Sequence, residues 1–218
     1  MQYQAVVFDM DGVIFDTERL VIEFWKEVAK RHNIPNVEHT CIQCLGTNRV
    51  RTREIFLENY GADFPFDPYR AEVTELFNTH YKGVPLPTKP GVRELLSYLQ
   101  EQDIKVGLAS STAQHLVRDE IGTAGLLPYF QTLVCGDMVE HSKPAPDIFL
   151  KACEILNADP TKSIAIEDSF NGIRSAHCAG MTPIMVPDQV QPTDEIRALA
   201  FHVMPSLLDV LYWLKTLA

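Results

Sequence analysis

The chain alternates short apolar runs with segments that carry apolar residues at helical spacing. Residues 5–8, AVVF, form a continuous apolar run, which is typical of a strand buried on both faces. Similar runs predict strands at residues 105–109, 132–135, 163–166, 182–186 and 201–204. The segments between and after them predict helices at residues 92–102, 113–123, 147–156, 171–179 and 206–217. This alternation predicts an α/β fold, a Rossmann-like doubly wound parallel sheet with helices on both faces.

One part of the chain breaks this alternation. Helical spacing recurs in residues 18–32, 49–60 and 68–81, with no convincing strand between them. The stretch VPLPTKPGV then ends the helical pattern, because its three prolines cannot continue a helix. We therefore expect an all-helical domain at residues 16–86, inserted into a discontinuous α/β core at residues 1–15 and 87–218.

Composition and charge narrow the class of protein. The chain has 218 residues, of which 46% are hydrophobic, which suits a globular protein with a sizeable core. No apolar stretch approaches the ~20 residues that span a bilayer, and the N-terminus lacks signal-peptide features, so we expect a cytoplasmic protein without membrane contact. A net charge of −10 argues against a nucleic-acid partner, although a few local cations would suffice for a small anionic substrate.

Cysteine and histidine patterns give little support for a metal or redox site. Cys41 and Cys44 form a C-x-x-C pair, but no second close pair accompanies them. In a cytosolic setting the five cysteines are most simply reduced thiols. The seven histidines show no paired ligand spacing of the H-E-x-x-H type, which argues against a zinc hydrolase.

Polar residues follow the predicted strands at the points where these strands end. In an open parallel sheet the ligand site lies beyond the carboxyl ends of the strands, so these residues are expected to meet. The set comprises four acids, one hydroxyl and one amine, the amine coming from the loop HSKPAP: Asp9, Asp11, Ser110, Lys143, Glu167 and Asp168.

Such a set of residues suits metal-assisted phosphoryl transfer. Four carboxylates in one crevice repel one another unless a cation lies among them, and all-oxygen ligation favours Mg2+. With a metal bound, Asp9 stays ionised and can attack phosphorus to form an aspartyl phosphate. Asp11 is then a candidate general acid and base. Ser110 and Lys143 are candidates for holding the phosphoryl oxygens.

Four sequence motifs occur together in one order along the chain. FDMDGVIFDTE, GLASST, SKPAPDIF and AIEDSFNGIRSA resemble the signature motifs of the haloacid dehalogenase superfamily. Their order and approximate spacing are similar to those of its β-phosphoglucomutase and small-sugar-phosphatase branch. The resemblance covers essentially the whole chain and implies that residues 16–86 form a helical cap over the site.

The resemblance also implies roles for individual residues. Asp9 corresponds to the nucleophile, Asp11 to the general acid and base, and Lys143 to a phosphate ligand, as do Ser110 and its neighbour Ser111. The implied Mg2+ ligands are Asp9, the main-chain carbonyl of Asp11, Asp168 and, directly or through water, Glu167. Within the superfamily, an acid at position 11 favours phosphoryl transfer over dehalogenation.

Cap residues are expected to select the substrate. The stretch CLGTNRV resembles the loop that members of this branch fold over the substrate, which makes Asn48 and Arg49 candidate substrate contacts. A second interpretation of Arg49 is a solvent-exposed surface residue. Glu18 lies where related phosphatases often have an acid. Asp16 and Thr17 are expected mainly to cap the helix that begins near Glu18.

The sequence favours a phosphatase that acts on a small phosphorylated metabolite, such as a sugar phosphate. The main alternative is a phosphomutase, for which Lys82 and Thr112 match other expected substrate contacts. Mutases of this branch typically carry a histidine where this chain has Val21. A non-catalytic phosphate-binding protein is a remote alternative, because a binding module gains nothing from two repelling acids at positions 9 and 11. A monomer is the simplest expectation.

Overall fold

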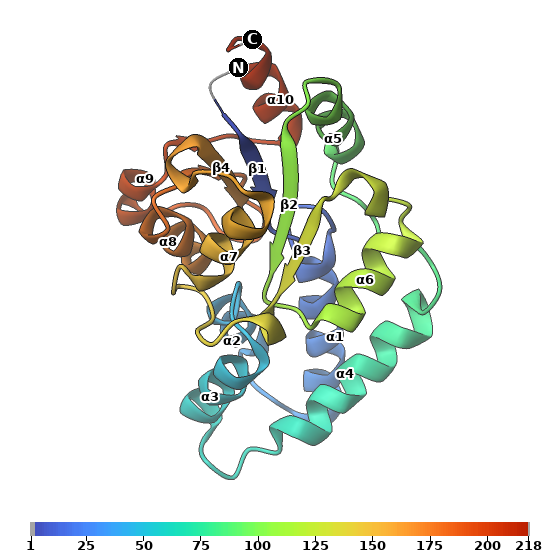
Figure 1. The fold of residues 1–218 in the computed structure, drawn as a ribbon. Coiled ribbons are helices and arrows are strands. Elements are labelled where there is room, and N and C mark those ends of the chain that lie inside the picture. Colours follow the sequence, from blue (N-terminus) through green and yellow to red (C-terminus); the bar gives the residue numbers. More distant parts are fainter. Residues whose placement is uncertain (1–2, 218) are drawn as a thin grey trace.

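The computed structural model describes residues 3–217 and contains a parallel β-sheet at its centre (Figure 1). The described strands are β1 (Ala5–Phe8), β2 (Lys105–Ser110), β3 (Thr132–Cys135), β4 (Ser163–Glu167), β5 (Thr182–Met185) and β6 (His202–Val203). They lie in the order β3-β2-β1-β4-β5-β6, and every neighbouring pair is parallel. The order reverses beside β1, so residues after β1, β2 and β4 meet at a topological switch point.

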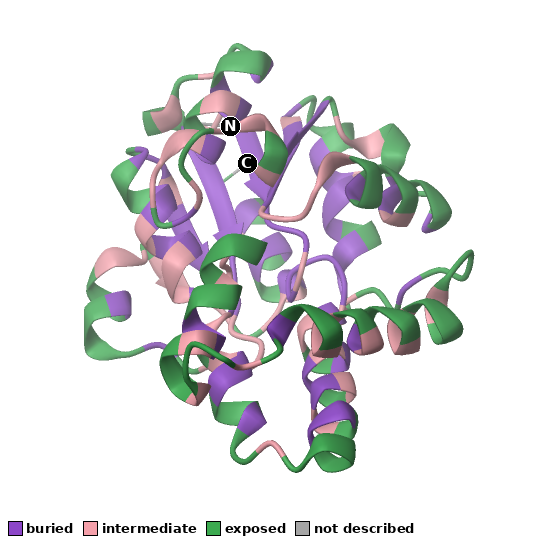
Figure 2. Cartoon of the chain, turned by 90° about the horizontal axis from the view of Figure 1, so that it is seen from below, coloured by how far each residue is buried: buried purple, intermediate pink, exposed green. Residues whose placement is uncertain are grey.

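Helices cover both faces of the sheet, as the alternating pattern predicts. One face packs against α5 (Val92–Glu101), α6 (Gln114–Thr123) and α10 (Leu207–Lys215). The other packs against α7 (Asp147–Leu156) and α8 (Phe170–Cys178), and α9 (Asp194–Leu199) packs on α8. Within β1, Phe8 points to the first core and Val7 to the second. Figure 2 shows buried strands at the centre and exposed residues on the outer sides of the helices.

Four further helices lie beyond the carboxyl ends of the strands (Figure 1). They are α1 (Thr17–His32), α2 (Val37–Gln43), α3 (Arg49–Tyr60) and α4 (Phe66–Tyr81). Their apolar residues form a separate cluster centred on aromatic rings: the Trp25 ring centroid lies 4.4 Å from that of Phe56 and 6.0 Å from that of Phe66. This helical bundle therefore has its own core beside the sheet.

Two segments connect the helical bundle to the sheet and pair with each other. Phe15 and Thr88 form an antiparallel bridge. The Asp16 amide donates a hydrogen bond to the Pro87 carbonyl at 2.9 Å, and the Lys89 amide donates to the Ile14 carbonyl at 2.9 Å. The outgoing and returning chains thus run side by side close to the end of β1.

The structure also contains elements that the hydrophobic pattern does not predict. Helix α2 has 7 residues and α9 has 6, too short to show two full turns of apolar spacing. The strand expected at residues 201–204 is reduced to His202–Val203. Short elements of this kind are defined by their tertiary contacts more than by their own periodicity.

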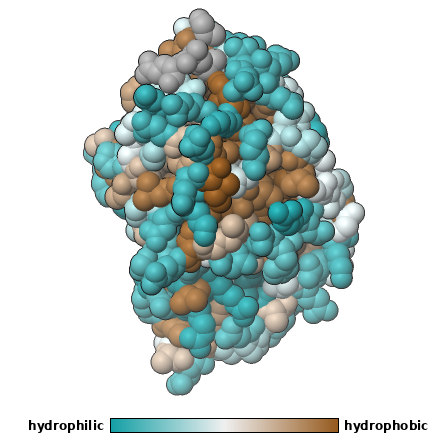
Figure 3. All heavy atoms as spheres, viewed as in Figure 1, coloured by the Kyte–Doolittle hydropathy of each residue, from teal (hydrophilic) through white to brown (hydrophobic). Residues whose placement is uncertain are grey.

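The surface carries no membrane-spanning element within the described part of the chain. Among residues 3–217, no helix is both long enough and apolar enough to cross a bilayer. In the view of Figure 3, hydrophobic residues gather over the sheet and its helices, whereas the lower part, over the α1–α4 bundle, is mainly hydrophilic.

Candidate active site

Asp9 lies at the end of β1, where three strands deliver polar groups to one point. Its amide donates to the Ile166 carbonyl at 2.9 Å, which aligns the end of β1 with that of β4. Lys143 Nζ donates to Asp9 Oδ1 at 2.5 Å, to Glu167 Oε1 at 2.6 Å and to the Ala109 carbonyl at 3.0 Å. Lys143 is only 3% exposed, so this ammonium links β1, β2 and β4 inside the protein.

Glu167 is held on both of its carboxylate oxygens. Oε1 accepts from Lys143, and Oε2 accepts from the Asp168 amide at 3.1 Å, from the Ser169 amide at 3.1 Å and from the Ser169 hydroxyl at 3.0 Å. The carboxylate also packs on Gly172 of α8, where an added Cβ would lie 1.8 Å from Glu167 Cδ. Glycine is therefore required sterically beneath this carboxylate.

Asp168 has an oxygen that the protein leaves without a partner. Asp168 is 2% exposed, and its Oδ2 is buried with no hydrogen bond. The backbone at Gly12, with φ of +79°, comes so close that an added Cβ would lie 2.3 Å from this atom. Asp9, Glu167 and Asp168 each offer an oxygen within 4.8 Å of the others. An orphaned carboxylate oxygen among three buried acids fits a divalent cation.

Electrostatics support the same interpretation. Burial raises the pKa of Asp9 well above its ordinary value, although Lys143 acts in the opposite direction. Burial, with repulsion by Glu167 and Asp9, likewise raises the pKa of Asp168. Burial also opposes the charge of Lys143, but Asp9 and Glu167 raise the pKa of this ammonium above its ordinary value. The single positive charge of Lys143 therefore does not balance the negative charges of these acids, and a divalent cation would add the missing positive charge.

Asp11 lies beside this acidic group and is oriented by two hydroxyls. Thr17 Oγ1 donates to Asp11 Oδ1 at 2.6 Å, and Thr112 Oγ1 donates to Oδ2 at 3.0 Å. Asp16 lies at the N-cap position of α1, but the expectation that the side chains of Asp16 and Thr17 cap this helix is wrong. Asp16 makes no side-chain cap hydrogen bond, and the Thr17 hydroxyl donates to Asp11 instead. These threonines come from the start of α1 and from the loop after β2.

The serines after β2 and Glu18 surround the same point. Ser110 is fully buried, and its Oγ accepts from the Thr112 amide at 3.1 Å. Ser111 Oγ donates to the Gly46 carbonyl at 3.3 Å, which joins the core to the loop before α3. Burial raises the pKa of Glu18, and the charges of Asp11 and Asp9 add to this effect. Glu18 therefore belongs to the same acidic neighbourhood.

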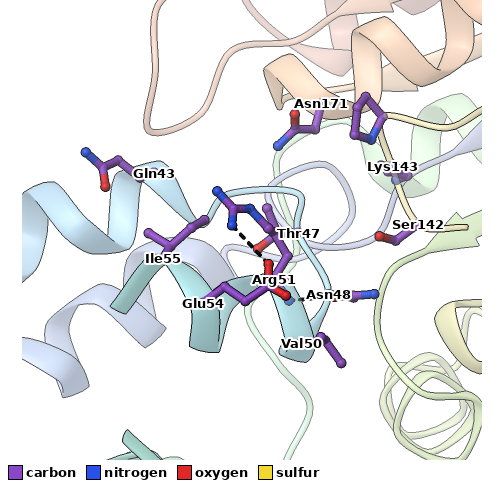
Figure 4. Close-up of a pocket in the computed structure, with 11 residues that line it drawn as sticks. Gln43, Thr47, Asn48, Val50, Arg51, Glu54, Ile55, Ser142, Lys143 and Asn171 are labelled. Atoms are coloured by element: carbon purple, nitrogen blue, oxygen red, sulfur yellow. Dashed lines mark hydrogen bonds and ion pairs between the residues drawn. The ribbon is translucent and has the colours of Figure 1, made fainter. Parts of the chain in front are cut away.

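A cavity of about 520 Å³ opens beside Lys143, between the helical bundle and the core (Figure 4). Its walls come from α2, α3, the loop at residues 142–144 and the start of α8. Several lining side chains are polar but uncharged: Gln43, Thr47, Asn48, Ser142 and Asn171. Asn48 also caps α3, because its Oδ1 accepts from the Arg51 amide at 3.0 Å. The cavity is the candidate space for the substrate beyond its phosphoryl group.

Two arginines of α3, Arg49 and Arg51, lie differently with respect to the cavity. Arg49 is 76% exposed and binds Asp67 of α4 at 3.0 Å, so the structure does not bring it into the cavity. Arg51 lines the cavity instead, and its guanidinium contacts Glu54 at 2.9 Å and Glu58 at 2.8 Å. The surface interpretation of Arg49 agrees with this arrangement.

The cysteine pair lies in the helical bundle. Cys41 is buried in its apolar cluster, and both Cys41 and Cys44 are free thiols. Burial raises the pKa of Cys44 to about 12, with a further contribution from Glu18. A thiol held neutral in this way is a poor nucleophile. That the cysteines are reduced thiols stays a prediction.

Comparison with known proteins places most of this chain in one protein family. The family model described as haloacid dehalogenase-like hydrolase matches residues 6–186. The chain is 34% identical to the phosphorylated carbohydrates phosphatase of Thermotoga maritima over 181 residues, 83% of each chain. It is also 34% identical to the β-phosphoglucomutase of Bacillus subtilis over 199 residues, 87% of this chain and 85% of that one.

A solved structure shows the same fold over nearly the whole length. The β-phosphoglucomutase of Clostridium difficile superimposes with a TM-score of 0.80 at 24% identity, covering 98% of this chain and 96% of the other. The match over residues 6–186 and the two relatives that are 34% identical show that the chain belongs to the haloacid dehalogenase-like hydrolase family.

Proposed function

We propose that this protein is a Mg2+-dependent phosphatase that hydrolyses a small phosphorylated metabolite through an aspartyl phosphate on Asp9. One observation carries the proposal: Asp9 follows β1 among buried acids and is bound to Lys143, and Asp168, whose Oδ2 has no partner, offers an oxygen within 4.8 Å of one from Asp9. A buried group of this composition is costly to fold, so a function that uses its charge accounts for it.

The residues present suit Mg2+. Asp9, Asp168 and the main-chain carbonyl of Asp11 would hold the ion. Glu167 already has partners on both oxygens, so it would act through a water molecule or by fixing its neighbours. When bound, the ion would neutralise the acids and polarise a phosphoryl oxygen.

The reaction would proceed in two displacements. In the first, an oxygen of Asp9 attacks phosphorus, the bond to the ester oxygen breaks, and Asp11 gives its proton to the departing alcohol. In the second, Asp11 takes a proton from water, the hydroxide attacks phosphorus, and Asp9 departs as a carboxylate with inorganic phosphate as product.

Three residues would bind and stabilise the transferred phosphoryl group: Lys143, Ser110 and Ser111. Lys143 is fixed by three acceptors, so its charge is in place before the substrate arrives. Preorganised charge of this kind stabilises the developing negative charge without reorganisation. Thr17 and Thr112 would orient Asp11 for both proton transfers.

We further propose that the helices α1–α4 act as a cap, residues 16–86, that encloses the substrate over the core at residues 1–15 and 87–218. The cavity between them carries amide and hydroxyl side chains, which suit a polyhydroxylated group. Arg51 is already neutralised by Glu54 and Glu58, so this wall does not favour a second phosphate. A sugar monophosphate fits both features.

A phosphomutase is the second candidate, and the name of the B. subtilis relative is its main support. Against it, this chain has Val21 where mutases of this branch typically carry a histidine. Val21 has no titratable group and packs against the apolar cluster of the helical bundle. The arrangement of Asp9 and Asp11 with two orienting hydroxyls also gives no support to a purely ligand-binding role.

Phosphate release from a panel of sugar phosphates and from p-nitrophenyl phosphate tests the proposal. We expect turnover with Mg2+, loss of turnover with EDTA, and no turnover for Asp9→Asn. Asp63→Asn, an exposed acid, is the control and should retain full activity. Turnover that survives chelation or the Asp9→Asn substitution would contradict the mechanism. Conversion of β-glucose 1-phosphate to glucose 6-phosphate with a bisphosphate activator, without net phosphate release, would select the mutase.

A further inference from the structure

Asp188 is the third residue after β5, at the same edge of the sheet as the acidic site. The Val186 amide donates to the Glu167 carbonyl at 2.7 Å, so the segment after β5 leaves the sheet beside the segment that carries Asp168. The roles proposed above do not use Asp188. Its position nevertheless follows the rule that ligand groups lie beyond the carboxyl ends of parallel strands.

One carboxylate oxygen of Asp188 is occupied and the other is not. Lys89 Nζ donates to Asp188 Oδ1 at 2.7 Å, and the Asp188 side chain is 6% exposed. Oδ2 is buried and has no hydrogen-bond partner. Buried carboxylate oxygens normally accept hydrogen bonds, so an orphaned one indicates a donor that the chain itself does not supply.

Asp188 and the proposed ligand Asp168 follow β5 and β4, which are neighbouring parallel strands. Asp168 Oδ2 is also buried and without a partner. The charge of Asp188 acts on both Asp168 and Glu18, where it contributes to raising their pKa values. Two open carboxylate oxygens at adjoining strand ends mark a place where a hydrated cation would supply the missing donors.

We propose that Asp188 is a positioning residue of the metal site, accepting a hydrogen bond on Oδ2 from a water molecule that the divalent ion carries. The inference rests on the Mg2+ dependence proposed above. Mg2+ keeps several waters in most protein sites, and groups that hold those waters tune its affinity.

Lys89 explains why this carboxylate keeps its orientation. Lys89 belongs to the segment that returns from the helical bundle, and its amide is bound to the Ile14 carbonyl. Its ammonium also lies 3.8 Å from Asp16 Oδ1 on the outgoing segment. The ion pair therefore anchors Asp188 to the paired connections between the bundle and the core.

Isothermal titration of the full-length protein with MgCl2 alone, without substrate, tests the inference. Asp188→Asn keeps the shape of the side chain but removes its charge, and we expect Mg2+ affinity to fall about tenfold. Glu195→Gln is the matched control, because Glu195 is likewise an acid paired with a cation, Arg174, but is exposed and lies on α9. The control should bind Mg2+ as the wild type does.

The possible outcomes separate the two proposals. If the wild type shows no Mg2+ binding, the proposed metal-dependent function fails and this inference fails with it. If the wild type binds Mg2+ and Asp188→Asn binds it within twofold, the function stands and the role of Asp188 is overturned. Circular dichroism checks the fold of the variant. If Asp188→Asn does not fold, Asp188→Ser, which leaves room for water, is titrated under the same criterion.

Discussion

Replacing Lys143 by Met tests whether one ammonium stabilises the acidic centre. Met has a similar length and keeps apolar contact near the Phe149 ring, which lies 5.1 Å from the Lys143 nitrogen. The substitution therefore removes the charge and three donated hydrogen bonds while leaving most of the packed volume. Asp9 and Glu167 are then buried side by side without a cation.

The size of the loss follows from the cost of neutralising one of these carboxylates. Breaking a buried ion pair by removing one partner costs about 3–5 kcal/mol. A protonated carboxyl limits this cost, because placing a proton on an acid of ordinary pKa takes about 4 kcal/mol at pH 7 and about 1.5 kcal/mol at pH 5. We therefore expect Lys143→Met to lose about 4 kcal/mol at pH 7 in metal-free buffer.

The sign of the pH dependence is part of the prediction. Without Lys143, attraction no longer opposes the effect of burial, so the pKa of Asp9 rises further. Acids with a raised pKa in the folded state destabilise the protein as pH rises, and protonation at lower pH relieves this effect. The difference between variant and wild type should therefore shrink to about 1.5 kcal/mol at pH 5.

Urea denaturation followed by circular dichroism at both pH values, with EDTA present, gives the free energies of unfolding. Lys151→Met is the matched control, because Lys151 Nζ donates to the Met138 carbonyl at 2.6 Å and pairs with no buried acid. Its loss should be about 1 kcal/mol at both pH values. A loss for Lys143→Met no larger than that of the control, or equal at pH 5 and pH 7, would refute the electrostatic reasoning.

Two further substitutions test the packing and the charge around the site. Gly172→Ala should destabilise the protein by about 1–3 kcal/mol or more, since its Cβ would collide with the Glu167 carboxylate. In the control, Gly122→Ala on α6, the added Cβ meets no atom within 4 Å, so thermal unfolding should show unchanged or higher stability. Equal effects of the two substitutions would contradict the steric argument. Burial, with the charge of Asp11, raises the pKa of Glu120 to about 8, so wild-type stability should fall as pH rises towards 8, and Glu120→Gln should raise Tm at pH 9 but not at pH 4.5. The control, Glu101→Gln, replaces an exposed acid and should change Tm equally at the two pH values. If Glu120→Gln also changes Tm equally at both, the raised pKa of Glu120 is refuted.

The strand ends were the part of the site that the sequence made predictable. Asp9, Ser110 and Asp168 each follow an apolar run, and parallel strands bring their carboxyl ends to one edge whatever the details of packing. The contacts around them are harder to predict from the sequence. The need for glycine at position 172, beneath Glu167, depends on how closely α8 approaches β4. Asp188 follows β5 under the same rule, so the strand pattern contained the signal for it.

The helical bundle was harder to predict because the rotation of a helix is set by its neighbours. Arg49 and Arg51 are two positions apart on α3, which places their side chains about 200° apart around the helix. Asp67 of α4 contacts both Arg49 and Arg53, one turn apart, so that face turns away from the cavity. The opposite face presents Arg51 with Glu58, and this rotation determines the charge that the cavity offers to a substrate.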